Sequence, residues 1–218
     1  MNGQSPPPSE VEILFFDEEI VVINKPGGLL AVPGRGPEKQ DCAAHRLRRL
    51  FPAMICQPAV HRLDMATSGL MVFAVTHGAQ KKLNQQFAQR LVDKGYLAVV
   101  HGIVATPGGI INLPHRLDPA NRPRQVYDPV HGKSSLSLWR RIAVEGDCSR
   151  IAWKPITGRT HQLRVHAAHP LGLGAAIVGD SIYGSGREGG KMLLHATTLG
   201  FCHPKTGEPL RFISPPPF

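Results

Sequence analysis

The sequence lacks any apolar run of the roughly 18 to 20 residues that a helix needs to cross a lipid bilayer. Its first ten residues are rich in proline and serine, and they lack the basic stretch followed by an apolar one that marks a secretory signal or a membrane anchor. We therefore expect residues 1–10 to be a disordered tail, and the chain to be a cytoplasmic protein without a membrane partner.

Cysteine is scarce, and the four cysteines stand far apart at Cys42, Cys56, Cys148 and Cys202. Because no C-x-x-C pair occurs, the sequence argues against a zinc ribbon and against a dithiol redox motif. A reducing cytoplasm is the simplest setting for such thiols.

Several motifs of cofactor and metal chemistry are also missing. The glycine-containing stretch 171–177 is not followed by the lysine and serine of a phosphate-binding loop, and Ser68 lacks the G-x-S-x-G context of a hydrolase nucleophile. His161, His166 and His169 have neither a known zinc spacing nor an acidic ligand nearby. We therefore expect no metal and no cofactor. A hydrolase or metalloenzyme that uses these histidines with a carboxylate is a weak alternative.

Acidic residues are few: 16 aspartates and glutamates oppose 25 lysines and arginines, which gives a formal net charge of +9. The 218 residues suffice for one domain with its own core. The basic excess is spread along the chain, at residues 46–49, 81–82, 116, 122–124 and 140–141. A basic surface on a folded domain favours a polyanion partner, with nucleic acid as the first candidate. A merely solvated basic surface has the same composition.

The most informative stretch is 61–69, His-Arg-Leu-Asp-Met-Ala-Thr-Ser-Gly, which runs directly into segment 70–75. That segment is apolar at every position, which is typical of a strand buried on both faces of a sheet. Asp64 thus stands just ahead of a buried strand, where a carboxylate is costly without partners. On these residues alone, Asp64 either caps the turn at 67–69 or takes part in chemistry.

Hydrophobic periodicity predicts a mixture of strands and helices. Strands are expected at 12–16 and 20–24 as a hairpin, and at 94–104, 135–142 and 150–154. Segments 192–196 and 210–212 are expected to be edge or closing strands. Helices are expected over 41–51 and from the N-cap Thr76 to about residue 90. Their apolar stripes are formed by Ala44, Leu47, Leu50 and Phe51 in the first and by Leu83, Phe87 and Leu91 in the second.

Residues 107–135 are rich in proline, glycine and basic side chains, and we expect a long, irregular, functional loop. This segment repeats the tetrapeptide His-Arg-Leu-Asp at 115–118. Pro119 follows the second copy and excludes the Thr-Ser-Gly turn, so we interpret this copy as a coincidence.

Stretch 155–166 places Arg164 between two apolar residues, so its side chain is expected to be partly buried and to need a carboxylate partner. Asp64 is the candidate partner. The stretch is compatible with an extended strand or with a short helix. Tyr96, at the start of a predicted strand, is either a core side chain or an aromatic ring that faces a cleft.

Ordered motifs along the chain resemble those of the RluA family of pseudouridine synthases. They are 24–29 (Asn-Lys-Pro-Gly-Gly-Leu), 61–69, 94–98 (Lys-Gly-Tyr-Leu-Ala), 156–166, and finally 179–184 with 193–196. The resemblance extends from about residue 13 to residue 212. One stretch, 169–176, departs from the family's pattern, which affects the expected loop geometry and substrate choice rather than the reaction.

The resemblance implies an α+β fold, with a single pseudouridine synthase catalytic domain over 11–214 and no separate N-terminal RNA-binding domain. The implied architecture is a large mixed, mostly antiparallel sheet with peripheral helices and a central basic cleft. The implied reaction is the isomerisation of uridine to pseudouridine in structured RNA, without a cofactor. The implied partners are 23S rRNA and the tRNA anticodon loop, and the enzyme is expected to be a monomer.

The same resemblance assigns roles to residues. Asp64 matches the family's catalytic aspartate, Arg164 the arginine that keeps it charged and aimed, and Tyr96 the active-site aromatic residue that stacks on the target base. Arg62 matches the residue that fills the place of a flipped base. The expected RNA-binding residues are His61, Arg62, Thr67, Lys81, Arg122, Arg124, Arg159 and His161.

Two further alternative functions are compatible with the sequence. A non-catalytic RNA-binding module would share the basic surface, but it leaves the ordered occurrence of Asp64, Tyr96 and Arg164 unexplained, as the hydrolase does. A synthase that modifies a single tRNA site would share every motif.

Overall fold

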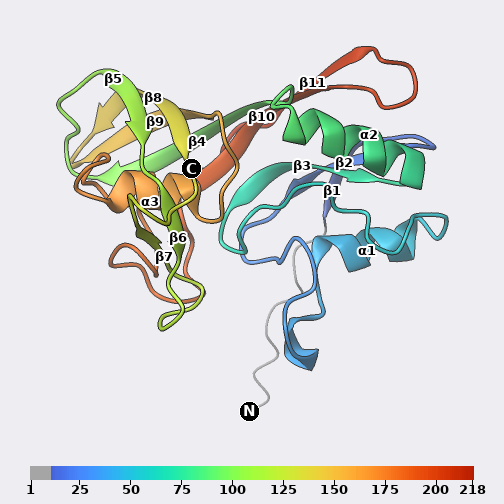
Figure 1. The fold of residues 1–218 in the computed structure, drawn as a ribbon, viewed down its shortest axis with the longest axis horizontal. Helices are drawn as coiled ribbons and strands as arrows, with labels where there is room; N and C mark the ends of the chain where they lie inside the picture. The colour runs from blue at the N-terminus through green and yellow to red at the C-terminus, as the bar shows by residue number, and fades with distance from the viewer. Residues whose placement is uncertain (1–10) are drawn as a thin grey trace.

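A computed structural model describes residues 11–218, so the tail expected at 1–10 lies outside the described residues. Most strands join one nine-stranded sheet in the order β1-β2-β3-β10-β4-β9-β8-β5, with β11 paired to β10, while β6 and β7 form a separate hairpin (Figure 1). Within the described residues every strand pairing is antiparallel except that of β3 with β10. The expected α+β fold with a mixed, mostly antiparallel sheet is therefore confirmed.

The element bounds are as follows. The strands are β1 Glu12–Phe16, β2 Ile20–Lys25, β3 Ser68–Ala74, β4 Asp93–His101, β5 Gly108–Asn112, β6 His115–Leu117, β7 Gln125–Tyr127, β8 Leu136–Glu145, β9 Cys148–Pro155, β10 Leu194–Cys202 and β11 Pro209–Ile213. The helices are α1 Ala43–Leu50, α2 His77–Ala88 and α3 Gln162–Ala168, with a short 3-10 turn at Pro37–Lys39.

The first half of the sheet, β1 to β3, lies between α1 on one side and α2 on the other (Figure 1). Val21 and Phe73 pack in the cluster that contains Leu47 of α1. Their neighbours in the strands face the opposite way, and Val72 packs in the cluster that contains Leu83 of α2. All seven residues of β3 are buried, which confirms the prediction of a strand covered on both faces.

Both predicted helices of this half exist, although each apolar stripe is one residue shorter than expected. Thr76 is the N-cap of α2, because its hydroxyl accepts a hydrogen bond from the Ala79 amide at 3.0 Å. Leu91 is 65% exposed, because α2 ends at Ala88 and a turn at Arg90 (φ 60°) redirects the chain. Leu50, the last residue of α1, is 61% exposed, so its assignment to the buried stripe was also wrong.

The sheet's two halves join through β10, which is central, whereas the sequence suggested an edge or closing strand there. In the nine-stranded sheet, β11 lies off the main strand order and pairs with β10. The parallel pairing of β10 with β3 is limited to two positions, where Ser68 and Gly69 meet His195 and Ala196. Gly69 has φ 114°, and a Cβ atom there would clash with the backbone of Ala196. A glycine is therefore needed where the two strands approach, directly after the 61–69 motif.

The second half contains β4, β9, β8 and β5, covered by α3 (Figure 1). Residues 162–168 form this helix, so the extended alternative for that stretch was wrong. The helix is favoured because Leu163 and Ala167, four residues apart, both pack on Ile151 and its neighbours. The departing stretch 169–176 folds back on α3, where the amides of Leu173 and Ala175 donate to carbonyls of the helix.

The segment at 107–135 is more regular than expected, since it contains β5 and the β6–β7 hairpin. A tight turn at residues 146–147 connects β8 and β9. None of the described helices is long and apolar enough to span a bilayer.

Candidate active site

A cleft of about 560 Å³ opens where the two halves of the sheet meet. Asp64 reaches it from the loop before β3, Tyr96 from β4 and Arg164 from α3, and all three line it. The Tyr96 ring packs against the core clusters of both halves. The cleft volume falls within the roughly 300 to 1,000 Å³ that small-ligand pockets occupy, so it can hold one nucleotide base with its sugar.

The loop that carries Asp64 is fixed at both ends. Leu63 is buried in the core cluster of the first half, and the Thr67 amide donates to the Asp64 carbonyl at 3.1 Å. The carboxylate itself is 25% exposed and faces the cleft. The backbone of Asp64 thus closes a turn with Thr67, and its side chain faces the cleft rather than capping residues 67–69.

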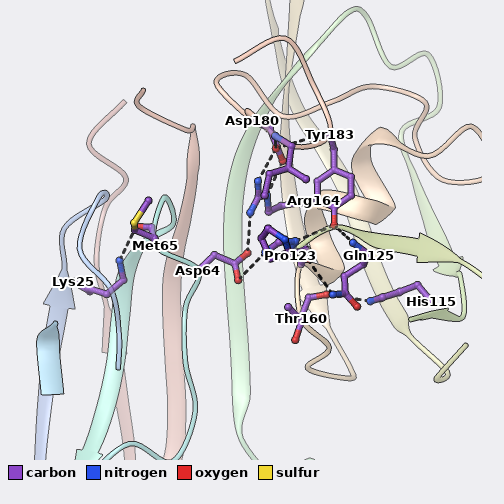
Figure 2. Close-up of polar contacts among 12 residues, drawn as sticks. Lys25, Asp64, Met65, His115, Pro123, Gln125, Thr160, Arg164, Asp180 and Tyr183 are labelled. Atoms are coloured by element: carbon purple, nitrogen blue, oxygen red, sulfur yellow. Dashed lines mark hydrogen bonds and ion pairs between the residues drawn. The ribbon is translucent and has the colours of Figure 1, made fainter. Parts of the chain in front are cut away.

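Arg164 approaches Asp64 as the sequence predicted, with Nη1 at 3.5 Å from Oδ2. Its main partner is a second carboxylate that sequence reasoning missed. Asp180 accepts from Nε at 2.8 Å and from Nη2 at 2.7 Å, and it is 1% exposed. Figure 2 shows Arg164 between the two carboxylates. The fork fixes the guanidinium plane and leaves Nη1 directed at Asp64.

Burial and pairing act in opposite directions on these charges. Burial lowers the pKa of Arg164, but the hydrogen bonds and charge of Asp180, together with Asp64, raise it above its ordinary value. Burial raises the pKa of Asp180, but the hydrogen bonds and charge of Arg164, together with the amides of Tyr183 and Ile182, outweigh burial and lower it. Both groups therefore stay charged at neutral pH. Burial, with the charge of Asp64, raises the pKa of Tyr96, so the phenol is neutral.

A fully buried lysine on the other side of Asp64 is another feature that sequence reasoning missed (Figure 2). The Nζ of Lys25 donates to the carbonyls of Leu29, Pro26 and Met65 at 2.7, 2.8 and 3.3 Å. Burial lowers its pKa to about 7, against a smaller opposing effect of Asp64. Lys25 thereby ties the loop after β2 to the residue that follows Asp64.

His161 lies on the remaining side of the carboxylate, with Nε2 at 3.9 Å from Oδ1 of Asp64. Its Nδ1 is 2.9 Å from the hydroxyl of Tyr183, a third residue that the sequence analysis did not assign. Burial lowers the pKa of His161, so the ring is neutral at pH 7. Asp64 therefore faces a fixed cation at one oxygen and a neutral imidazole at the other.

Most of the residues expected to bind RNA line this cleft, namely His61, Arg62, Thr67, Arg159 and His161. His61 has a structural role. The pairing of β3 with β10 covers only Ser68 and Gly69, and further along β3 the Val72 amide donates instead to Nε2 of His61 at 3.1 Å. Burial and the charge of Lys94 lower its pKa to about 3, so it is a neutral acceptor.

A second, larger cavity of about 900 Å³ adjoins the first and shares Arg62 and Arg159 with it. Its basic lining residues are Arg35, Lys39, Arg62, Arg116, Arg122, Lys133 and Arg159. Such a concentration of positive charge beside an open cleft is suited to phosphate groups. Arg122 was an expected RNA-binding residue. Arg35 and Lys39 come from the connection between β2 and α1, and Lys133 from the connection between β7 and β8, so only the fold brings these two segments together.

Lys81 and Arg124 line neither cavity. Lys81 is exposed on α2, and the Arg124 guanidinium lies 5.0 Å from the ring centre of Tyr183 and donates to the Ile182 carbonyl. Asp118, in the repeated tetrapeptide, binds Asn121 at 2.8 Å on the hairpin surface and is also outside both cavities.

Residues 19–169 match the protein family described as RNA pseudouridylate synthase. The dual-specificity RNA pseudouridine synthase RluA of Pasteurella multocida is 42% identical over 218 aligned residues, which cover 97% of each chain. The protein of the same name from Escherichia coli K12 is 41% identical over 97% of each chain. Among solved structures, human RNA pseudouridylate synthase domain containing 1 superposes with a TM-score of 0.77 at 30% identity, covering 98% of this chain and 87% of that one.

The family match covers well over half of the chain, and it includes Asp64, Tyr96 and Arg164. The expected activity, isomerisation of uridine to pseudouridine in RNA, is thus confirmed at the level of the family. From its sequence, its fold and these relatives, the chain belongs to the RNA pseudouridylate synthases.

Proposed function

We propose that this enzyme isomerises defined uridines in both 23S rRNA and the tRNA anticodon loop, with Asp64 as the catalytic carboxylate. The observation that carries the assignment of Asp64 is its position in the cleft, within 3.5 Å of an arginine that Asp180 already holds. The choice of two RNA classes is supported by the relatives, whose names describe dual specificity.

The reaction breaks the N1–C1′ bond, turns the base within the cleft, joins C5 to C1′, and moves a proton from C5 to N1. It conserves atoms and oxidation state, so it needs no cofactor. An ionised carboxylate can begin it by attack on C1′, by attack on the base, or by removal of the C2′ proton. Asp64 is suited to each route because its oxygens face the cleft.

Arg164 and Tyr96 have distinct roles in this proposal. Arg164 directs its positive charge at the Asp64 carboxylate and holds it in one orientation. The Tyr96 ring, set between the two core clusters, stacks on the uracil and holds it while the glycosidic bond is broken. The neutral Tyr96 hydroxyl is available to interact with the C5 proton once the base has turned.

A uridine inside folded RNA must leave its stack to enter the cleft, which costs a few kcal/mol. Arg62 is exposed and lies on the boundary between the two cavities, so its side chain can occupy the vacated place in the RNA. Arg122, Arg159 and Lys133 would contact the neighbouring phosphates. Loop uridines are favoured because their flipping is less costly.

RNA is the partner in this account, and the enzyme acts as a monomer in the cytoplasm. Support for the compartment comes from the four cysteines, all of which are free thiols. A single chain suffices for the proposed chemistry because Asp64, Tyr96 and Arg164 come from one protomer.

The test is to incubate unmodified 23S rRNA and tRNA with the purified protein and with Asp64→Asn, in EDTA, and to map carbodiimide-dependent reverse-transcription stops. Stops in both RNAs with the wild type alone are expected. Stops in tRNA alone would favour the single-site synthase. RNA binding without stops would favour a non-catalytic module, and dependence on added metal would favour the hydrolase or metalloenzyme alternative.

A further inference from the structure

Tyr183 joins the active site to the β6–β7 hairpin. Its hydroxyl accepts from the Gln125 amide at 2.7 Å and lies 2.9 Å from Nδ1 of His161 (Figure 2). Its own amide donates to Asp180 at 3.0 Å, and its ring lies 5.3 Å from the guanidinium of Arg164. One side chain therefore contacts both of the groups that face Asp64.

The hydrogen bonds of Tyr183 favour one of the two neutral tautomers of His161. The Tyr183 oxygen already accepts a hydrogen bond from the Gln125 amide, so its own hydrogen is free to donate. Within residues 11–218, Nδ1 of His161 is the acceptor that the structure provides for it. A neutral imidazole that accepts at Nδ1 has its proton on Nε2, and Nε2 is the atom that faces Asp64 at 3.9 Å.

The backbone of His161 supports the same orientation. Its φ of 56° lies in the left-handed region, which residues other than glycine rarely adopt, and it directly precedes α3. Such a conformation is strained and persists where surrounding contacts hold it. Here the conformation turns the imidazole into the cleft, between Tyr183 and Asp64, with 7% of the side chain exposed.

We propose that Tyr183 is a positioning residue for catalysis, which holds His161 as the Nε2–H tautomer so that Asp64 has a donor at Oδ1 as well as Arg164 at Oδ2. The inference rests on the proposed role of Asp64. The 3.9 Å separation leaves the donor free to shorten its contact with Asp64, or with a substrate oxygen, when RNA closes the cleft.

The electrostatic surroundings of His161 agree with a neutral donor. Burial is the main cause of its lowered pKa; Asp64 and Asp180 act to raise that pKa, whereas Arg164 and Arg62 act to lower it. An imidazolium would also have to donate at Nδ1, where Tyr183 donates already. Protonation of the ring would therefore reverse this contact, with the Tyr183 oxygen accepting a hydrogen bond from Nδ1–H.

Tyr183→Phe tests the proposal because it removes the hydroxyl and keeps the ring beside Arg164. We expect the single-turnover rate of pseudouridine formation to fall about tenfold, the size expected for one lost hydrogen bond, with RNA affinity unchanged within about twofold. Tyr127→Phe is the matched control: Tyr127 is half-buried at the end of β7, outside both cavities, and should keep the wild-type rate. A wild-type rate for Tyr183→Phe would overturn the inference.

The second readout is the protonation of the His161 ring, measured by ¹⁵N NMR and assigned with His161→Gln. At pH 7 the wild-type ring should have a bare Nδ1 and a protonated Nε2, and Tyr183→Phe should give a mixture of tautomers. A protonated Nδ1 in the wild type would overturn the proposal even if Tyr183→Phe does not fold. This readout needs no turnover, so it remains decisive if the wild type forms no pseudouridine, a result that would count against the proposed function alone.

Discussion

Asp180 binds the guanidinium of Arg164 through two hydrogen bonds, of 2.8 and 2.7 Å, in the buried wall of the cleft. The pair is preorganised: Arg164 has its orientation before any RNA is bound. Asp64, by contrast, is 25% exposed and lies 3.5 Å from the same guanidinium. One arginine thus serves a structural carboxylate and a reactive one.

Removal of the Asp180 charge should destabilise the fold. In Asp180→Asn the buried Arg164 loses its paired charge, and breaking a buried ion pair typically costs about 3 to 5 kcal/mol. We expect the free energy of unfolding, measured by urea denaturation at pH 7.5, to fall by that amount. Glu145→Gln, which breaks an exposed pair with Arg150, is the control and should change little. Equal effects of the two variants would contradict the structural role of Asp180.

The position of Asp180 could not be predicted from sequence, although the need for it could. The apolar neighbours of Arg164 correctly indicated burial and a carboxylate partner, and they correctly suggested Asp64. Asp180 is 16 residues away, in the 179–184 motif beyond the departing stretch, and only the turn after α3 brings it to the guanidinium. Lys25 and Tyr183 were quoted within motifs, but nothing in their local sequence indicated contact with the site.

The fold was predictable where the hydrophobic pattern was unambiguous. The segment at 70–75 and the N-cap at Thr76 gave β3 and the start of α2. The stretch that contains Arg164 was ambiguous, because apolar residues at 163, 165 and 167 satisfy both a period of two and, in part, a helix. The central position of β10 depends on a two-residue parallel pairing, for which a single sequence has no local signal.

The buried Lys25 should make stability depend on pH. Its pKa falls from 10.5 to about 7 on folding, so between these values the unfolded chain binds a proton that the folded chain does not. Stability should therefore rise with pH in this window, and for this group by about 2 kcal/mol between pH 7 and pH 9. The measurement is urea denaturation of the wild type and of Lys25→Met at both values.

Lys25→Met should lose that rise, whatever its overall stability, because it has no proton to release. The difference between the two proteins in their change from pH 7 to pH 9 isolates Lys25 from other titrating groups. Parallel pH dependences would contradict the prediction, because they would mean that folding does not lower the pKa of Lys25.

The second cavity should contribute salt-dependent RNA affinity. In an Asp64→Asn background, Arg122→Ala with Lys133→Ala removes two cations from its lining. We expect the slope of log K against log salt concentration to fall in magnitude by about 1.5, because each lost phosphate contact removes about 0.7 to 0.9. The binding of tRNA is measured from 50 to 300 mM KCl, a range over which salt screening of charges becomes markedly stronger.

The matched control for this experiment is Arg140→Ala with Lys205→Ala in the same background, since both residues are exposed outside the two cavities. The control has the same change in net charge. An equal loss of slope in both double variants would assign the effect to overall charge rather than to the cavity.

The most direct test of the account is tritium release from tRNA that contains [5-³H]uridine, because formation of the C5–C1′ bond displaces the C5 hydrogen. The wild type should release tritium in EDTA, Asp64→Asn should release none, and Asp118→Asn, the matching change in the second His-Arg-Leu-Asp copy, should release tritium at the wild-type rate. Tritium release by Asp64→Asn at a rate comparable to the wild type would contradict the central claim that this carboxylate performs the reaction.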